Sequence, residues 1–400
     1  MDCGPPDVPV EQPRWFAAGR SVDPDPRNAG AQAAASAFAR DNPKLALVFA
    51  SDAYDIRAVL EGIRGRTGDT PLIGCSTAGE IATTGPGNAS VVVVALGGPG
   101  FSVTTGIGRQ ASGGLREAGA EAAACVGDLS DRDERPHQVL LLLSDGLAGD
   151  QQEIVRGAHG VVGAAVPLVG GCAGDDLKMH TTFQLHGSEI LRDAVVAAAI
   201  ASDAPFGIGV RHGWRRAGRP MVVTRSANNR VYSLDGAPAL DAYLDRLGAP
   251  PAVRCDAQEF TRFALTHPLG LNRRTGEEQV RFVGEADFED RSLGCIAEVP
   301  QGGLAWIMEG DRDSVLAATD GACEQALAPL NGTRPLGLIA FDCIARRGVL
   351  GDEGVTTEIE RLAGRAAGAP VAGFYTYGEF ARTRGVTGFH NQTLVVLAVG

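Results

Sequence analysis

Several features that mark large functional classes are missing from this sequence. No apolar run approaches the roughly 20 residues that a membrane-spanning helix needs. The opening MDCGPPDVPVEQP is acidic and proline-rich, and it lacks the charged-then-apolar pattern of a secretion leader. The eight cysteines include no Cys-x-x-Cys pair, so neither a disulfide framework nor a zinc site is expected. These absences predict a cytoplasmic protein with reduced thiols and no membrane contact.

Positive charge is also scarce. The 400 residues carry a net charge of −12, which disfavours a polyanion such as nucleic acid as partner. Arg215-Arg216 and Arg273-Arg274 are too sparse to change that expectation and are interpreted as solvated surface. A hydrophobic content of 44% is ordinary for a globular chain, and the length favours two domains.

Two distant stretches are near copies of each other. PLIGCSTAGEIATT runs from Pro71 to Thr84, and PVAGFYTYGEFART runs from Pro370 to Thr383. Both contain Pro, two apolar residues and Gly, followed by a Thr-x-Gly-Glu turn. A weaker copy, PLVGGCAGDD, lies between them at Pro167 to Asp176 and is one residue shorter. This pattern indicates an internal structural repeat.

The repeat extends to the surrounding elements. A short apolar run typical of a buried strand precedes each turn by a similar interval, a helical stretch lies between them, and a valine- or alanine-rich strand follows. Helical crossovers favour parallel strand pairs, whereas tight links favour antiparallel ones. The sequence therefore predicts an α/β fold whose mixed sheets are flanked by helices. The expected helices are Asn28–Arg40, a helix capped by Ser51 or Asp52 that runs to about Arg64, Asp150–Ala165, Asp235–Gly248, Asp311–Leu327 and Val355–Ala367.

The sequence pattern changes near residues 210–230, which indicates a domain boundary. We expect a loose tail at residues 1–14, one α/β domain over residues 15–220 and a second over residues 221–400.

Six motifs in order carry a resemblance to a known family. They are IGCSTAGEI, GGCAGDD, LDGAPALDAYLDRLG, HPLGL, FDCIAR and GFYTYGEF with FHNQTLVVLAV, and they extend from about Trp15 to the C-terminus. Together they resemble the FIST family, in which FIST N and FIST C domains are paired. The two expected domains correspond to these. The resemblance implies a sensory role in bacterial signal transduction, with small molecules such as amino acids as ligands.

The turns offer a chemistry for such a ligand. Glycines let a ligand approach the backbone closely, acids accept an ammonium group, and hydroxyls, amides or an arginine bind a carboxylate. The expected ligand-binding residues are Thr77, Gly79, Glu80, Asp175, Asp176, Tyr375, Thr376, Tyr377, Gly378, Glu379 and Arg382, with Arg384 as an alternative to Arg382. The competing interpretation is structural, because a Thr-x-Gly-Glu turn can use its acid to tie its own backbone together.

Two other site chemistries are open. The FIST resemblance includes haem-binding nitric oxide sensors, for which His267 is the candidate ligand, with Phe260, Phe263, Leu265 and Leu269 as an apolar wall. His390 is expected to hold the turn ahead of the last strand. Cys75 invites a thiol-hydrolase reading, but no histidine lies near it in sequence. A phosphate cradle is disfavoured, because both outer turns carry an acid and lack the P-loop lysine.

The sequence thus predicts a non-enzymatic sensor of a small polar metabolite, without a cofactor. Since no output domain follows the last motif, the signal is expected to pass to a separate partner such as a kinase or cyclase. The alternatives are a haem-based gas sensor and a protein-interaction scaffold without a small ligand.

Overall fold

The computed structural model describes residues 14–130, 133–272, 279–383 and 388–400. Three units of similar topology follow one another along the chain, so the internal repeat predicted from sequence is confirmed. Residues 1–13, the predicted tail, lie outside the described ranges. In the described part of the chain, no helix is long and apolar enough to span a membrane.

The first unit contains an edge strand, two helices, a parallel strand pair, a small hairpin and a closing strand. In order these are β1 (Trp15–Ser21), α1 (Pro26–Ala37), β2 (Pro43–Ser51), α2 (Ile56–Thr67), β3 (Leu72–Thr77), β4 (Glu80–Ala82), β5 (Gly85–Gly87) and β6 (Val91–Gly97).

The second unit repeats this order. It contains β7 (Phe101–Arg109), α3 (Leu115–Ala123), β8 (His137–Ser144), α4 (Gln151–Val162), β9 (Leu168–Cys172), β10 (Gln184–His186), β11 (Glu189–Leu191) and β12 (Ala194–Ser202), with 3₁₀ turns at Ala111–Gly113 and Ala124–Asp128.

The third unit is interrupted after its first strand. It contains β13 (Phe206–Arg211), α7 (Arg312–Leu327), β22 (Gly337–Cys343), α8 (Ile344–Arg365), β23 (Val371–Thr376), β24 (Glu379–Arg382), β25 (Phe389–His390) and β26 (Leu394–Val399), with a 3₁₀ turn at Ala328–Leu330.

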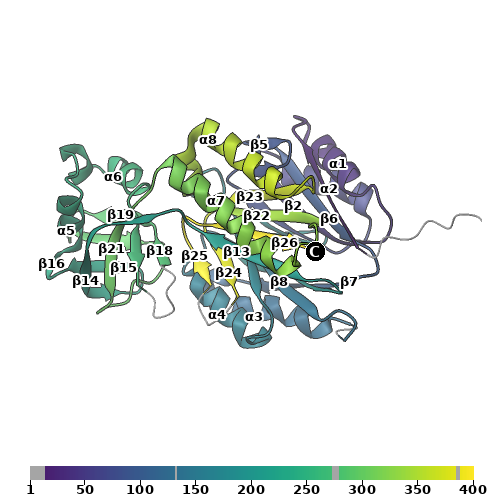
Figure 1. The fold of residues 1–400 in the computed structure, drawn as a ribbon, viewed down its shortest axis with the longest axis horizontal. Coiled ribbons are helices and arrows are strands. Elements are labelled where there is room, and N and C mark those ends of the chain that lie inside the picture. Colours follow the sequence, from purple (N-terminus) through teal and green to yellow (C-terminus); the bar gives the residue numbers. More distant parts are fainter. Residues whose placement is uncertain (1–13, 131–132, 273–278, 384–387) are drawn as a thin grey trace, which may run out of the picture.

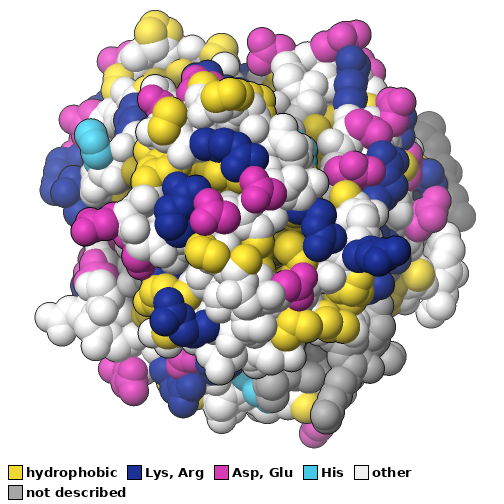
Figure 2. Space-filling model, turned by 90° about the vertical axis from the view of Figure 1, so that its left-hand side faces the viewer, with side chains coloured by type: hydrophobic (Ala, Val, Ile, Leu, Met, Phe, Trp, Pro, Cys, Tyr) yellow, Lys and Arg dark blue, Asp and Glu magenta, His cyan; other side chains and the backbone are white. Residues whose placement is uncertain are grey.

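Residues 214–310, between β13 and α7, form what we call the inserted domain, which projects from one end of the molecule (Figure 1). It contains β14 (Arg215–Ala227), β15 (Arg230–Leu234), β16 (Ala237–Pro238), α5 (Ala239–Arg246), a 3₁₀ turn (Pro251–Arg254), α6 (Ala257–Ala264), β17 (Leu269–Leu271), β18 (Gln279–Arg281), β19 (Val283–Asp287), β20 (Ser292–Cys295) and β21 (Leu304–Glu309). Its strands form one antiparallel sheet. On the end face to which this domain belongs, acidic and basic side chains are intermixed (Figure 2).

The three units exchange hairpins in a cycle. The hairpin β4–β5 of the first unit pairs with β23 of the third, β10–β11 of the second pairs with β3 of the first, and β24–β25 of the third pairs with β9 of the second. Each sheet is mixed as predicted: the strands joined by a crossover helix, such as β2 and β3, are parallel, and the closing strand is antiparallel. The two sequence domains are therefore interlocked through shared sheets.

The inner faces of the three sheets share one core. Phe49 of β2 stacks on Phe374 of β23 at a centroid distance of 4.8 Å, and Leu141 and Val196 of the second unit belong to the same cluster. The outer faces are covered by helix pairs, α1 with α2, α3 with α4, and α7 with α8. Strands buried on both faces explain the continuous apolar runs in the sequence.

Four helix starts differ from the sequence prediction. α1 begins at Pro26 and not at Asn28, because the Asp25 side chain caps it by accepting from the Asn28 amide. α2 begins at Ile56 and not directly after Ser51 or Asp52. α5 begins at Ala239 and not at Asp235, since Ala237–Pro238 pairs with β15 first. α8 begins at Ile344, directly after β22, and kinks at Gly351, whose φ of 62° breaks the helical backbone ahead of the predicted stretch.

Candidate functional site

The turns that follow β3, β9 and β23 meet and hydrogen-bond to one another in a ring. The first and third turns are joined by Ala78 N to Tyr375 O at 2.9 Å and Tyr375 N to Gly79 O at 2.8 Å. The remaining contacts of the ring are Cys172 N to Gly378 O (2.8 Å), Tyr377 N to Cys172 O (3.2 Å) and Gly174 N to Ser76 O (3.1 Å). The repeated motif thus places three copies of one turn around a common centre, which we call the turn ring.

The first and third turns close on their own acids. Oε1 of Glu80 accepts the Thr77 hydroxyl, while Oε2 accepts the Ser90 amide at 3.0 Å and the Ser90 hydroxyl at 2.6 Å. In the third turn Glu379 accepts the Thr376 hydroxyl and, through Oε2, the Thr393 amide at 3.2 Å. Both acids therefore tie the turn to the strand that follows it.

Neither acid reaches solvent. Glu80 and Glu379 are both 0% exposed, as are Thr77 and Thr376. Burial raises the pKa of Glu80 to about 7 and that of Glu379 to about 8, even though hydroxyl and amide donors act in the opposite direction. The expectation that these four side chains face a ligand is corrected: the structure shows them in the structural role that the sequence left as the alternative.

The middle turn is built differently. It has Cys172 where the other turns have Thr, and the shorter Asp175 where they have Glu. The amide of Asp193, equivalent to that of Ser90 and Thr393, donates to Asp145 at 3.0 Å instead. Asp145, at the end of β8, thus accepts the amide equivalent to those that Glu80 and Glu379 accept in the outer turns. Asp175 therefore makes other contacts.

Asp175 organises the loop that follows. Its carboxylate accepts the amides of Met179 (3.0 Å), His180 (2.7 Å) and Thr181 (3.0 Å), and also the Tyr377 hydroxyl. Burial pushes the pKa of Asp175 upward, but the Tyr377 and backbone hydrogen bonds outweigh it and bring the pKa below its usual value. The carboxylate is charged at neutral pH and holds the loop in place.

This loop faces solvent in an unusual backbone conformation. Asp176, Leu177 and Met179 have φ values of 53°, 61° and 55°, in the left-handed region that non-glycine residues seldom adopt. Leu177 is 59% exposed and Met179 57% exposed. Such strain persists only where surrounding contacts enforce it, and here the Asp175 hydrogen bonds do so.

Charged side chains from all three units meet beside the middle turn. Asp176 of the second unit lies close to the carboxyl of Asp52, which follows β2 of the first unit. Lys178 Nζ lies 2.7 Å from Asp52 Oδ2. Arg347, from α8 of the third unit, donates to Ala78 O at 2.9 Å and to Asn88 Oδ1. We call Asp52, Asp176, Lys178 and Arg347 the junction cluster.

The junction cluster is half-buried and holds both signs of charge. Burial, and then the Asp52 carboxyl, raise the pKa of Asp176, while Lys178 and Arg347 lower it. One oxygen of Asp52 is buried and has no hydrogen-bond donor. Two neighbouring carboxyls favour a cationic group between them, because each disfavours the charged form of the other. Among the predicted ligand residues, Asp176 is the charged side chain that the structure leaves accessible at the ring.

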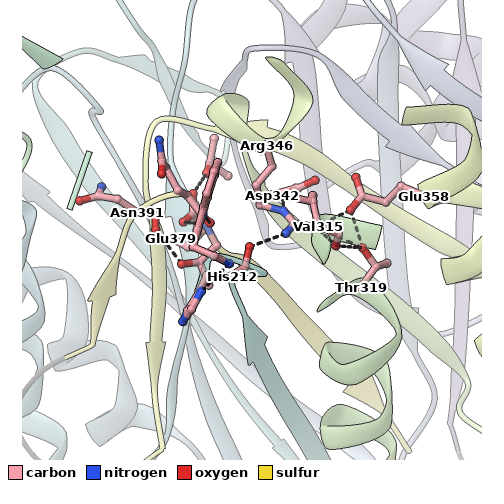
Figure 3. A network of polar contacts seen from close by, with 12 residues as sticks. His212, Val315, Thr319, Asp342, Arg346, Glu358, Glu379 and Asn391 are labelled. Atoms are coloured by element: carbon pink, nitrogen blue, oxygen red, sulfur yellow. Dashed lines mark hydrogen bonds and ion pairs between the residues drawn. The ribbon is translucent and has the colours of Figure 1, made fainter. Parts of the chain in front are cut away.

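A second charged cluster is fully buried next to the third turn (Figure 3). Arg346 of α8 binds Asp342 through Nε at 2.6 Å and Glu358 through Nη2 at 2.5 Å, and Thr319 also donates to Glu358 at 2.6 Å. Burial raises the pKa of Asp342 well above its usual range, and the neighbouring charge of Glu358 raises it further. The cluster thus places one buried guanidinium between two buried acids.

Comparisons with known proteins agree with this architecture. A FIST N domain model matches residues 44–237, and a FIST C domain model matches residues 239–382. The chain belongs to the FIST family. FIST domains are sensory domains of signal-transduction proteins, so the family resemblance drawn from the sequence motifs is confirmed.

The chain is similar to proteins that are described as uncharacterized. One, from Mycobacterium tuberculosis (strain H37Rv), is 29% identical over 400 residues and covers 94% of this chain and 97% of the relative. Another, from Methanocaldococcus jannaschii, is 27% identical over 154 residues, 36% of this chain, and the match spans 30% of that relative's length. A solved cyanuric acid hydrolase from A. caulinodans aligns over 96% of this chain at 11% identity with a TM-score of 0.34, which is too low to support shared activity.

The other predicted residues lie in structural positions. Tyr375 is fully buried beneath Arg347, whose guanidinium lies 5.0 Å from the ring centroid. Arg382 is also buried and donates to Gly163 O at 2.7 Å and Val166 O at 3.3 Å. Its guanidinium holds the end of α4, which corrects the expected carboxylate clamp, and Arg384 lies outside the described residues.

His267 lies in the inserted domain, away from the turn ring. Its Nδ1 is 2.9 Å from Phe263 O, and its ring stacks on Phe263 at 4.5 Å. Phe260 and Leu269, expected to line a haem pocket, are fully buried in that domain's own core. These residues do not form a haem cradle. His390 lies 3.0 Å from Ala381 O through Nε2, in the structural role expected for it.

Six of the seven described cysteines are buried, and Cys255 is exposed. All seven in the described ranges are free, and Cys75 is fully buried, with burial raising its pKa well above the usual value. A thiol held neutral is a poor nucleophile, so the structure opposes the hydrolase alternative. Among the described residues, no group of three or more His, Cys, Asp or Glu side chains is placed to hold a metal.

The sequence reasoning missed Asp52, Lys178 and Arg347. A signal for the first was present, because Ser-Asp ends both the first and the second copy of the same strand, at Ser51-Asp52 and Ser144-Asp145. The other two are charged residues in segments without a repeated pattern, and only the fold brings them to the ring.

Proposed function

We propose that this FIST protein is a non-enzymatic sensor that binds a small zwitterionic metabolite, an amino acid, at the junction cluster. The proposal rests on one observation. Asp52, Asp176 and Arg347, which come from three different units, meet beside a loop that is held in a strained conformation. In this proposal the signal passes to a separate partner protein, such as a kinase or cyclase.

The chemistry of the cluster matches both ends of an amino acid. Asp52 and Asp176 accept an ammonium group, which competes with Lys178 for Asp52. Arg347 provides the cation for the ligand's carboxylate, and its existing bonds to Ala78 O and Asn88 fix its position beforehand. A ligand bound in this way touches all three units at once, so its binding changes how they are held together.

Calorimetric titration with each of the twenty L-amino acids tests the proposal. We expect at least one to bind, and Asp176→Asn to weaken that binding by about tenfold or more, because one charge-assisted contact is lost. The melting temperature of Asp176→Asn should stay close to that of the parent, since the side chain is half-exposed.

Glu379→Gln is the matched control. Its carboxyl lies in the same ring but is buried and already bonded, so the substitution should change stability and leave amino-acid affinity within about twofold. Absence of binding by every amino acid, or equal affinity of Asp176→Asn and the parent, contradicts the proposal. An absorption spectrum after haem addition, compared with that of His267→Ala, separately checks the gas-sensor alternative, for which no Soret band is expected.

A further inference from the structure

One segment of the third unit touches both the turn ring and the inserted domain. Residues 389–393, which we call the return segment, lead from β25 into β26. The inserted domain binds this segment three times. Trp214 Nε1 donates to Gln392 O at 2.9 Å, Gln392 Nε2 donates to Leu265 O at 2.9 Å, and Gln279 Nε2 donates to Phe389 O at 3.1 Å.

The same segment closes the third turn of the ring. The Thr393 amide donates to Glu379 Oε2, and His390 pairs with Glu379 across β24 and β25. Figure 3 shows Glu379 and Asn391 near the buried Arg346 cluster. The turn ring therefore lies on one side of the return segment, and the inserted domain lies on the other.

Arg346 adds a second connection. Its Nη1 donates to His212 O at 3.1 Å, and His212 Nδ1 accepts the Trp214 amide at 2.9 Å, in the linker that leads into the inserted domain. Arg347 of the junction cluster is the next residue along α8. The position of Arg347 is thus tied through the helix to the linker.

The first unit offers an internal comparison. Ser90 closes the turn of Glu80 in the same way that Thr393 closes the turn of Glu379. The segment before Ser90 contacts Arg347, which donates to the Asn88 side chain, and Ser51, whose hydroxyl donates to the Asn88 carbonyl at 3.4 Å. Within the described residues, Glu379 is thus joined to the inserted domain directly through the return segment, whereas Glu80 reaches it only indirectly, by way of Asn88, Arg347 and α8.

We propose that the inserted domain is the part of this protein that reports the state of the turn ring, and that the return segment carries the coupling. The signalling role of the inserted domain rests on the proposed function, whereas the structural coupling between the turn ring and this domain does not require a ligand. A change at the third turn or at Arg347 alters the return segment and the linker, and thereby the local stability of residues 214–310. The domain's surface then differs between the two states and offers a partner something to distinguish.

Hydrogen–deuterium exchange on the full chain without ligand tests the coupling. We expect Glu379→Gln to raise exchange rates in β17 and β18 of the inserted domain by about fivefold, and Glu80→Gln to change them by less than about twofold. Trp214→Phe removes the indole N–H and keeps an aromatic ring. Because it removes one of the three hydrogen bonds to the return segment, Glu379→Gln should have a smaller effect on the inserted domain in that background.

Equal effects of the two glutamate variants, or exchange changes from Glu379→Gln confined to β23–β26, overturn the proposal. Should Glu379→Gln fail to fold, Thr376→Val and its counterpart Thr77→Val give the same comparison, since each removes the hydroxyl bonded to the acid. Because no ligand is used, a negative result in the amino-acid titration leaves this test unaffected, and the two proposals can fail separately.

Discussion

The outer two turns of the ring and the middle turn started from one pattern and serve different purposes. In the outer turns, a buried Glu accepts a Thr hydroxyl and the amide of the following strand, and nothing in either side chain remains for a ligand. In the middle turn, Asp145 takes that structural role, and Asp175 instead holds a solvent-facing loop. The departure from the repeat, and not the repeat itself, marks the candidate site.

The comparison shows how a duplicated motif can mislead. Repetition of Thr-x-Gly-Glu drew attention to Glu80 and Glu379, but the structure shows that each copy needs this acid to satisfy buried backbone donors. A side chain required for folding in each copy is constrained by that role. The middle copy, one residue shorter, escapes the constraint because Asp145 is available at the end of β8, the strand that pairs with β9.

The largest expected effect is a pH dependence that separates the turns. The folded-state pKa of Glu379 is raised from 4.5 to about 8, so its contribution to stability is fully present below pH 4.5 and is lost as the pH rises toward 8. Glu379→Gln lacks this dependence. The unfolding free energy of Glu379→Gln relative to that of the parent should rise by about 1.4 kcal/mol per pH unit over this window, on the order of 5 kcal/mol in total.

Chemical denaturation between pH 5 and pH 8.5 measures this difference. Glu80→Gln should behave alike but level off near pH 7, where the Glu80 carboxyl ionises. Asp175→Asn should show a constant difference from the parent, because the Asp175 pKa is lowered and its contribution is lost only in acid, as the pH falls through the folded value. Parallel curves for all three variants would mean that the outer acids are not held neutral.

The next effect concerns the turn glycines. Gly79 has a φ of +115°, and a Cβ there would lie 2.2 Å from Arg347 Nη1 and 2.9 Å from Gly87 O. Gly174, at the equivalent place in the middle turn, does not have a positive φ. A Cβ added there would lie 3.1 Å from its nearest neighbouring atoms. Gly79→Ala should therefore cost about 3 kcal/mol of unfolding free energy, and Gly174→Ala about 1 kcal/mol. Similar losses in urea melts would show that the two turns share one backbone geometry.

Much of the fold followed from local sequence patterns. The buried strands before each turn, such as Val139–Ser144, were recognisable because residues buried on both faces form continuous apolar runs. Crossover helices fixed the parallel pairs. The cyclic exchange of hairpins was not predictable, because β4–β5 has the same local sequence requirements whether it pairs with its own β3 or with β23. Strand partners of that kind are chosen by the shape of the whole core.

The site was predicted only in part for a related reason. Asp176 was identified from the turn motif, but its neighbours Asp52 and Arg347 are separated from it by more than a hundred residues. Exposure was the other missing quantity, since sequence alone does not distinguish the closed Glu80 from the open Asp176. Both distinctions depend on how three turns meet, which no single copy of the motif contains.

The smallest expected effect tests the bridge between an outer turn and the middle one. Tyr377 of the third turn donates to Asp175 and accepts the amides of Asp175 at 3.2 Å and Leu177 at 2.7 Å. The hydroxyl of Tyr375, two residues earlier, is buried without a hydrogen-bond partner. Tyr377→Phe should cost about 2 kcal/mol of unfolding free energy and speed amide exchange in residues 176–181. Tyr375→Phe removes a polar atom that already lacks a partner, so thermal melts should show it within about 0.5 kcal/mol of the parent or slightly more stable. A larger loss for Tyr375→Phe than for Tyr377→Phe would show that the Tyr377 hydroxyl does not bridge the two turns, and the middle loop would then be held by Asp175 alone.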